Sequence, residues 1–137
     1  MNGPDALVGV VLVSHSKAVA EAVVELTTGL AGGGTKAPVA AAGGTPDGGL
    51  GTSSALIAAA ARKVDRGAGV ALLVDLGSAV LTVKAMIADG DELPTGALLV
   101  DAPFVEGAVA AVVSASAGAD LAAVATAAEE AYGYRKE

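Results

Sequence analysis

The sequence predicts an α/β protein with an open parallel sheet of four strands and helices on both faces. Short apolar runs alternate with longer, alanine-rich amphipathic stretches along the 137 residues, which is the pattern of repeated βα units. The short runs are almost continuously apolar, as is typical of strands covered on both faces. Hydrophobic residues make up 53% of the chain and aromatic residues only 2%, so we expect a core of closely packed Ala, Val and Leu.

The predicted strands are the four short apolar segments. They run over Leu7 to Ser14, Ala37 to Ala42, Val70 to Asp75 and Ala97 to Asp101. The simplest right-handed winding places the first and third strands side by side, which gives the order 2-1-3-4 along the sheet. The carboxyl ends of the first three strands then border a single crevice, where open α/β sheets bind their ligands.

The amphipathic stretches between the strands predict five helices. They run over about 17 to 30, 54 to 65, 79 to 88, 103 to 115 and 120 to 132. Ser16 and Asp120 are the expected N-caps of the first and last helices, because their side chains can accept hydrogen bonds from free N–H groups of the first turn. At 137 residues the chain fits a single domain, residues 1–137, with one well-covered core.

Composition excludes several classes of function. The formal net charge of −7 repels a phosphate backbone, so we expect no nucleic acid partner. The absence of cysteine and the single histidine exclude disulfides, thiolate nucleophiles and Cys- or His-rich metal sites. Uncharged stretches such as 107 to 119 are shorter than the roughly 20 residues of a membrane helix. We therefore expect a cytoplasmic protein with no membrane contact, no metal and no permanently bound cofactor.

The only histidine, His15, is the strongest candidate for chemistry. It ends the first apolar run and is followed directly by a helical stretch. An imidazole can act as a nucleophile or proton carrier near neutral pH, and a helix N-terminus beside it favours an anion such as phosphate. The alternative is a buried or half-buried histidine with satisfied hydrogen bonds. The position at a strand end favours the functional interpretation.

Asp75 ends the third strand, which the predicted order places beside His15. A carboxylate that accepts the Nδ1 proton of a histidine fixes its tautomer and leaves Nε2 with a free lone pair. The alternative is that Asp75 caps the third helix or forms part of a turn. Ser78 has a similar ambiguity, between capping that helix and contacting a phosphate.

A glycine-rich loop over 43–53 follows the second strand. It contains no G-x-x-x-x-G-K-[ST], and no strand is followed by G-x-G-x-x-G, so direct binding of ATP or NAD has no motif support. The loop offers backbone N–H groups around Gly44 and the hydroxyls of Thr45, Thr52 and Ser53, which could hold a phosphoryl group. The alternative is a plain surface loop.

Five segments resemble motifs of the mannose-type enzyme IIA domains of the phosphotransferase system. They occur in the family's order and cover nearly the whole chain. The segments are Gly9 to Ser16 (GVVLVSHS), Ala42 to Gly48 (AGGTPDG), Gly51 to Ser53 (GTS), Leu73 to Ala79 (LVDLGSA) and Val105 to Ala108 (VEGA). Within that family, the chain is most similar to the phosphocarrier subunits of phosphoenolpyruvate-dependent dihydroxyacetone kinases.

This resemblance implies a fold, a reaction and partners. The family fold is a parallel sheet with flanking helices, in a homodimer. His15 would receive a phosphoryl group from the phosphocarrier protein HPr and pass it to ADP on the nucleotide-binding subunit of the kinase. Asp75 would orient the His15 ring, while Gly44, Thr45 and Ser78 would lie near the phosphoryl group. The chain would thus be a phosphotransferase subunit, with HPr and the nucleotide-binding and substrate-binding kinase subunits as partners.

Two other functions stay open. An enzyme IIA domain of a mannose-type sugar transporter would use the same His15 with another acceptor, and a non-catalytic regulatory domain of this fold would tolerate its replacement. The third helix departs from the family pattern, because Leu81, Thr82 and Lys84 stand where a Met-Asn pair and an acid are expected. Two further acids, Asp101 and Glu106, are interpreted as structural.

Overall fold

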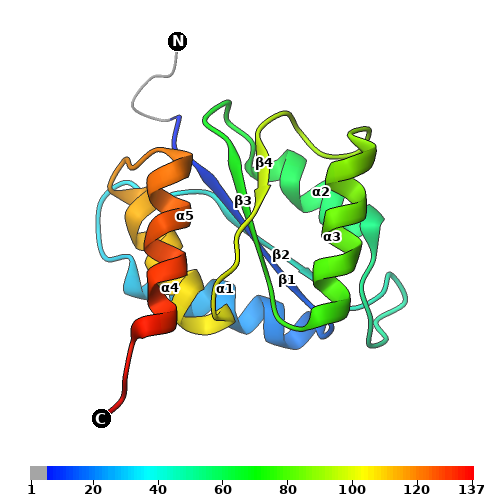
Figure 1. The fold of residues 1–137 in the computed structure, drawn as a ribbon, viewed down its shortest axis with the longest axis horizontal. Coiled ribbons are helices and arrows are strands. Elements are labelled where there is room, and N and C mark those ends of the chain that lie inside the picture. The colour runs from blue at the N-terminus through cyan, green and yellow to red at the C-terminus, as the bar shows by residue number, and fades with distance from the viewer. Residues whose placement is uncertain (1–5) are drawn as a thin grey trace.

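The computed structural model describes residues 6–137, and the predicted α/β architecture is confirmed in them. Four parallel strands form one sheet in the predicted order β2-β1-β3-β4 (Figure 1). The strands are β1 (Gly9–Ser14), β2 (Val39–Gly43), β3 (Val70–Val74) and β4 (Ala97–Leu99). Because β1 pairs with both β2 and β3, its carboxyl end adjoins the carboxyl ends of two neighbours.

Helices cover both faces of this sheet. They are α1 (Lys17–Leu30), α2 (Ser54–Val64), α3 (Gly77–Asp89), α4 (Phe104–Ser116) and α5 (Leu121–Glu130), and a 3-10 turn, η1 (Ala131–Gly133), follows. The first, fourth and fifth helices pack on one face, and the second and third pack on the other (Figure 1). Within residues 6–137 no helix is both long enough and apolar enough to cross a membrane.

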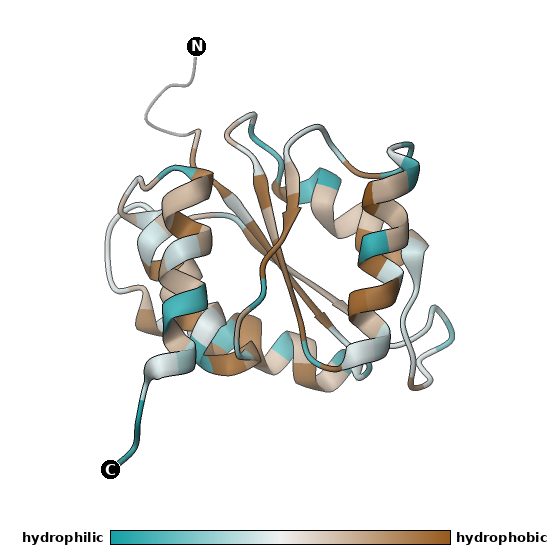
Figure 2. Cartoon of the chain, viewed as in Figure 1, coloured by the Kyte–Doolittle hydropathy of each residue, from teal (hydrophilic) through white to brown (hydrophobic). Residues whose placement is uncertain are grey.

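Side chains of β1 alternate between the two halves of the core, as the pleat of a strand requires. Val10 and Leu12 pack with α1, α4 and α5, whereas Val11 and Val13 pack with α2 and α3. All four side chains are completely buried. Figure 2 shows β1 and β3 as apolar along most of their length. Burial on both faces explains why the sequence of each strand is a continuous apolar run.

Several predicted boundaries differ from the structure by one or two residues. The first strand begins at Gly9 rather than Leu7, because pairing with β3 begins at Gly9 opposite Val70. The fourth strand ends at Leu99, where its pairing with β3 also ends. The third helix begins at Gly77, two residues before its predicted start. This earlier start places Ser78 inside the first turn of the helix rather than at its N-cap.

The predicted caps of the first and last helices are confirmed. The Ser16 hydroxyl accepts a hydrogen bond from the N–H of Val19 at 3.2 Å. The Asp120 carboxylate accepts one from the N–H of Ala123 at 2.9 Å. The Ser16 cap marks the start of α1, which begins at Lys17, two residues after His15.

Candidate functional site

His15 lies at the carboxyl edge of the sheet, between the end of β1 and the first turn of α1. Its backbone is tied to both neighbouring loops. The N–H donates to Asp75 Oδ2 at 3.1 Å, and the carbonyl oxygen accepts from the N–H of Gly51 at 2.9 Å. The side chain is 23% exposed. The ring is thus held in place while one part of it faces the surface, which suits a reactive group better than a core histidine.

Asp75 lies beside His15, as the sheet order predicts. Its Oδ1 is 2.9 Å from Nδ1 of His15 and also accepts from the N–H of Leu76 at 2.7 Å. Its Oδ2 accepts from the Ser14 hydroxyl at 2.8 Å and from the N–H of His15 at 3.1 Å. The alternative that Asp75 caps α3 is wrong, because the N-cap is Leu76 and has no side-chain cap bond.

These contacts keep the Asp75 carboxylate ionised. Burial acts to raise the pKa of Asp75, but hydrogen bonds from the Ser14 hydroxyl, the His15 ring and two backbone N–H groups outweigh it, so this pKa lies below the ordinary value of 3.8. An ionised carboxylate can only accept a hydrogen bond. The proton of the neutral imidazole is therefore assigned to Nδ1, which leaves the lone pair of Nε2 available for chemistry.

Nε2 of His15 points toward the start of α3, where the Ser78 hydroxyl is its hydrogen-bond partner. With the imidazole proton on Nδ1, the Ser78 hydroxyl is the donor of this bond. Ser78 follows Gly77 inside the first turn, so the alternative that it caps the helix is wrong. Because α3 has no side-chain cap, free N–H groups and the helix dipole at its N-terminus favour negative charge close to Nε2.

The glycine-rich loop between β2 and α2 forms another side of the site. Gly44 has a φ of 70°, and its N–H donates to the Ser14 carbonyl oxygen at 3.1 Å. The Thr45 hydroxyl donates to Asp47 and accepts from the N–H of Gly49 at 3.0 Å. In the part of the chain that the structure describes, no hydrogen bond joins Gly44 or Thr45 to the His15 ring. Their role as phosphate ligands therefore stays a prediction.

The remaining hydroxyls of this loop have structural partners. The Ser53 hydroxyl caps α2 by accepting from the N–H of Leu56 at 3.2 Å. The Thr52 hydroxyl lies 3.2 Å from that of Thr82 on α3. This contact was not expected from the sequence, and it joins the loop to the helix that carries Ser78. The loop and α3 therefore flank His15 as one connected unit.

Two acidic side chains singled out in the sequence, Asp101 and Glu106, lie outside the site. Glu106 is ion-paired to Lys136 at 2.8 Å, and Asp101 accepts from the hydroxyl of Tyr132 at 2.7 Å. Both contacts agree with the structural interpretation of these acids. Among residues 6–137, no three His, Cys, Asp or Glu side chains gather as a metal site would need.

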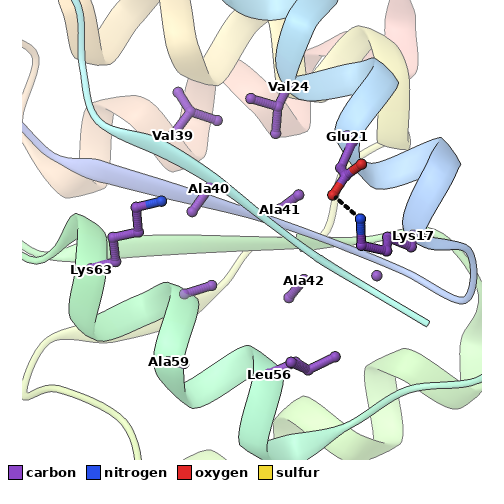
Figure 3. A pocket seen from close by; sticks show the side chains of 12 residues that line it. Lys17, Glu21, Val24, Val39, Ala40, Ala41, Ala42, Leu56, Ala59 and Lys63 are labelled. Carbon is purple, nitrogen blue, oxygen red and sulfur yellow. Dashed lines mark ion pairs between the residues drawn. The ribbon is translucent and has the colours of Figure 1, made fainter. Parts of the chain in front are cut away.

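The His15 ring lines neither of two hollows that border the sheet. One, of about 390 Å³, lies between α3 and β4 and is lined by Asp75 and Lys84 among other residues, so it adjoins the site. The other, of about 420 Å³, follows the open edge of β2 between Lys17 of α1 and Lys63 of α2 (Figure 3). Figure 3 also shows the ion pair of Lys17 with Glu21, at 2.8 Å. The imidazole of His15 is therefore partly exposed at the surface and lies outside both hollows.

Comparison with known families shows the family of this chain. Residues 9–125 match the model of the EIIA-man family, described as the PTS system fructose IIA component. The chain belongs to the EIIA-man family. In this EIIA-man chain the matched range includes all four strands and the residues around the imidazole, namely Ser14, His15, Asp75 and Ser78.

Curated relatives of this EIIA-man chain share one description. The chain is 33% identical over 108 residues to "PEP-dependent dihydroxyacetone kinase 2, phosphoryl donor subunit DhaM" of Listeria innocua, covering 78% of this chain and 85% of that protein. It is 35% and 36% identical over 117 residues to the DhaM subunits of Escherichia coli and Pantoea ananatis. These matches cover 84% of this chain and 25% of each relative, so the chain spans a quarter of their length.

A solved structure confirms the fold of the EIIA-man chain. The crystal structure of EF1359, a protein described as of unknown function, superposes with a TM-score of 0.78 at 30% sequence identity. The superposition covers 96% of this chain and 98% of the other. The arrangement of sheet and helices around the site is therefore shared with an experimentally determined relative.

Proposed function

We propose that this EIIA-man chain is a phosphohistidine carrier. His15 accepts a phosphoryl group from HPr and passes it to ADP on the nucleotide-binding subunit of a dihydroxyacetone kinase, whose other subunit binds dihydroxyacetone. The observation that carries the proposal is the geometry of one ring, with Nδ1 bonded to ionised Asp75 and Nε2 directed to the surface beside Ser78. The relatives described as phosphoryl donor subunits support this choice of acceptor.

In the first transfer, the Nε2 lone pair of His15 attacks the phosphorus atom of the donor's phosphohistidine. A new N–P bond forms as the donor's N–P bond breaks, and the donor imidazole leaves with the electron pair. The Nδ1 proton stays on His15, where the Asp75 carboxylate balances the positive charge that spreads over the ring. Most of the catalysis comes from such positioning and charge stabilisation, as is typical of phosphoryl transfer.

In the second transfer, a terminal phosphate oxygen of ADP attacks the phosphorus atom held on His15. The N–P bond breaks, its electron pair returns to Nε2, and ATP is formed on the kinase subunit. The carrier is then ready for another cycle without any permanently bound cofactor. Between the two transfers, the protein carries only the phosphoryl group.

Ser78 and the start of α3 support the phosphorylated state. The Ser78 hydroxyl now occupies the direction in which the phosphoryl group would bond to Nε2, so it must rotate aside when the group arrives. It can then donate to a phosphoryl oxygen. The uncapped N-terminus of α3 adds free N–H groups and a favourable dipole on the same side.

A protein donor has to dock over the imidazole, and three exposed leucines lie close in sequence to hydrogen-bond partners of His15. Leu50, Leu76 and Leu81 are 83%, 62% and 70% exposed. Each is close in sequence to a hydrogen-bond partner of His15, because Leu50 precedes Gly51, Leu76 follows Asp75, and Leu81 lies one turn after Ser78 on α3. Exposed apolar side chains around a reactive group are typical of a protein-binding surface.

A second acceptor is favoured by the family description, which names a fructose IIA component. In that function the phosphoryl group on His15 would pass to a sugar transporter.

We also propose a homodimer, and the apolar side chains of Leu26 and Leu30, 43% and 58% exposed on α1, support an interface with a second copy. Light scattering of the purified protein measures the oligomeric state directly.

Reconstitution of the pathway tests the proposed acceptor. The mixture contains phosphoenolpyruvate, enzyme I, HPr, both kinase subunits, ADP and dihydroxyacetone, with and without this protein. We expect dihydroxyacetone phosphate to form only when the protein is present, and to be lost with His15→Ala. If the protein becomes phosphorylated but neither ATP nor dihydroxyacetone phosphate forms, the acceptor is another one, such as a sugar transporter.

A further inference from the structure

Ser14 is a buried polar residue in a strand that is otherwise apolar. Ser14 and Thr27 are the buried polar side chains among residues 6–137. The Thr27 hydroxyl donates to the carbonyl oxygen of Val24 within its own helix, at 3.0 Å. The Ser14 hydroxyl instead reaches Asp75, which is 61 positions later in the chain. A buried hydroxyl is costly unless it is hydrogen-bonded, so the Asp75 contact explains how Ser14 can be accommodated there.

The direction of the Ser14 hydroxyl follows from its two partners. Its oxygen accepts a hydrogen bond from the N–H of Ser16 at 3.1 Å. Asp75 is ionised and can only accept, so the single hydroxyl proton of Ser14 points at Oδ2, 2.8 Å away. Only 1% of Ser14 is exposed, which leaves no room for water to compete for that proton.

This bond restricts the one rotation that would disturb the site. The terminal torsion of an aspartate side chain is broad in the absence of partners. Here Oδ2 is held by Ser14 and by the N–H of His15, while Oδ1 is held by the N–H of Leu76 and faces Nδ1. Without the Ser14 bond, the carboxylate can turn away from the imidazole and accept water instead.

We propose that Ser14 is a positioning residue, whose hydroxyl fixes the Asp75 carboxylate so that Oδ1 holds the His15 ring in the Nδ1–H tautomer. Its kinetic consequence rests on the proposed phosphocarrier function. Its effect on the tautomer does not depend on that function. Ser14 thus acts through Asp75 and makes no contact of its own with the transferred group.

The test compares Ser14→Ala with Ser16→Ala in the full chain. Both serines flank His15, but the Ser16 hydroxyl caps α1 at the N–H of Val19 and does not contact Asp75. Two measurements are made on each protein. One is the rate of phosphorylation by phosphorylated HPr and by phosphoramidate, a small chemical donor, and the other is the ¹⁵N NMR signature of the imidazole tautomer.

We expect Ser14→Ala to slow phosphorylation by both donors about tenfold, the effect of losing one hydrogen bond to a charged group. Its ring should populate both neutral tautomers, whereas Ser16→Ala should keep the wild-type tautomer and rate. Ser14→Thr retains the hydroxyl and should restore most of the rate. Ser14→Cys, with a weaker donor in a side chain of similar size, should be slower than Ser14→Thr and keeps the test available if Ser14→Ala does not fold.

A purely structural role gives a different result. If Ser14→Ala unfolds at a lower temperature but keeps the wild-type tautomer and rate, the proposal is overturned. Equal rates for Ser14→Cys and Ser14→Thr would also overturn it. If the wild-type protein accepts no phosphoryl group from either donor, the phosphocarrier function fails, and the tautomer comparison still decides the role of Ser14.

Discussion

At the scale of single residues, the proposed reactivity of His15 depends on one ionised neighbour. Asp75 accepts four hydrogen bonds, three of them from Ser14 and His15 at the end of β1. Its pKa lies below the ordinary value because these bonds outweigh the effect of burial. The negative charge selects the tautomer that frees Nε2 and balances the charge of the phosphorylated ring. In the proposed reaction, Asp75 therefore acts through His15.

Replacement of Asp75 by asparagine should slow phosphorylation of His15 by at least tenfold. The amide is neutral and can donate to Nδ1, which favours the tautomer with the proton on Nε2 and blocks the attacking lone pair. The rate is measured with phosphorylated HPr, and circular dichroism checks that the fold is kept. Asp101→Asn, which removes a carboxylate bonded to Tyr132 outside the site, is the control. A wild-type rate for Asp75→Asn would assign Asp75 a structural role.

The same carboxylate should contribute to stability in a pH-dependent way. Because the pKa of Asp75 is lower in the folded protein than its ordinary value of 3.8, the unfolded chain binds the proton first as pH falls. The contribution is fully present above about pH 5 and is lost as pH falls below about 4 through the folded pKa. At neutral pH, the free energy of unfolding of the wild-type protein should exceed that of Asp75→Asn by on the order of 1 kcal/mol. Urea unfolding should show that difference shrinking at about pH 3, and a constant difference would contradict the assignment.

The main residues of the site could be predicted from sequence, because His15 and Asp75 each follow an apolar run that ends at the same edge of a parallel sheet. Ser14 could not be assigned a role, because its side chain is buried in the strand and the rotamers that direct its hydroxyl to Asp75 are not visible in the sequence. The hydroxyl of Thr45 illustrates the same limit. It bonds within its own loop, to Asp47 and Gly49, and nothing in the residue pattern indicates that direction.

At the scale of elements, close approach between β2 and α1 positions the imidazole. A Cβ atom on Gly43 would lie 2.5 Å from the Ser16 carbonyl oxygen and 2.7 Å from Cα of Lys17. Only a glycine lets the end of β2 pass this close to the start of α1. The segment that carries His15 is therefore confined by the neighbouring strand as well as by Asp75.

Gly43→Ala should destabilise the protein by about 1 to 3 kcal/mol, as overpacking typically does, and should slow phosphorylation by displacing the start of α1. Gly29→Ala is the matched control, because a Cβ there meets nothing within 4 Å. In a helix interior, alanine is also more stabilising than glycine by roughly 0.5 to 1 kcal/mol. Denaturant unfolding measures the stability of both variants. Equal stability of the two variants would show that the approach at Gly43 does not constrain the fold.

Element types were predicted better than element ends. The first and last helices have side-chain caps at Ser16 and Asp120, and such caps are visible in a sequence. The third helix begins without one, after Leu76. Rules based on capping residues therefore place its start too late, at the serine and alanine that follow Gly77. That two-residue difference moves Ser78 from a cap to the turn that faces Nε2.

At the scale of the whole molecule, sheet order follows from right-handed connections and continuous apolar strands, so it could be predicted. The surfaces that partners use could not be predicted, because exposed apolar residues are common on any protein. Only the folded chain shows that three leucines are exposed and that residues close to them in sequence bond to His15, namely Leu50, Leu76 and Leu81 near Gly51, Asp75 and Ser78. A variant at one of these leucines can therefore test docking of the donor protein without changing the groups that contact the imidazole.

Leu81→Asp should lower the second-order rate of phosphorylation by HPr about tenfold or more, because a charge replaces an apolar contact at the docking surface. Phosphorylation by phosphoramidate should be unchanged, since that small donor needs no docking surface. Ile87→Asp, at a position 38% exposed near the opposite end of α3, should leave the HPr rate unaltered. Equal HPr rates for all three proteins would place the donor elsewhere.

The central claim is that His15 carries the phosphoryl group, and the most direct measurement is the intact mass of the protein after incubation with phosphoenolpyruvate, enzyme I and HPr. Spectra are recorded at neutral or basic pH, because phosphohistidine is labile in acid. We expect one acid-labile phosphoryl group on the wild-type protein and none on His15→Ala. An unlabelled wild-type protein, with donors that phosphorylate a known acceptor, would contradict the claim, as would equal labelling of His15→Ala.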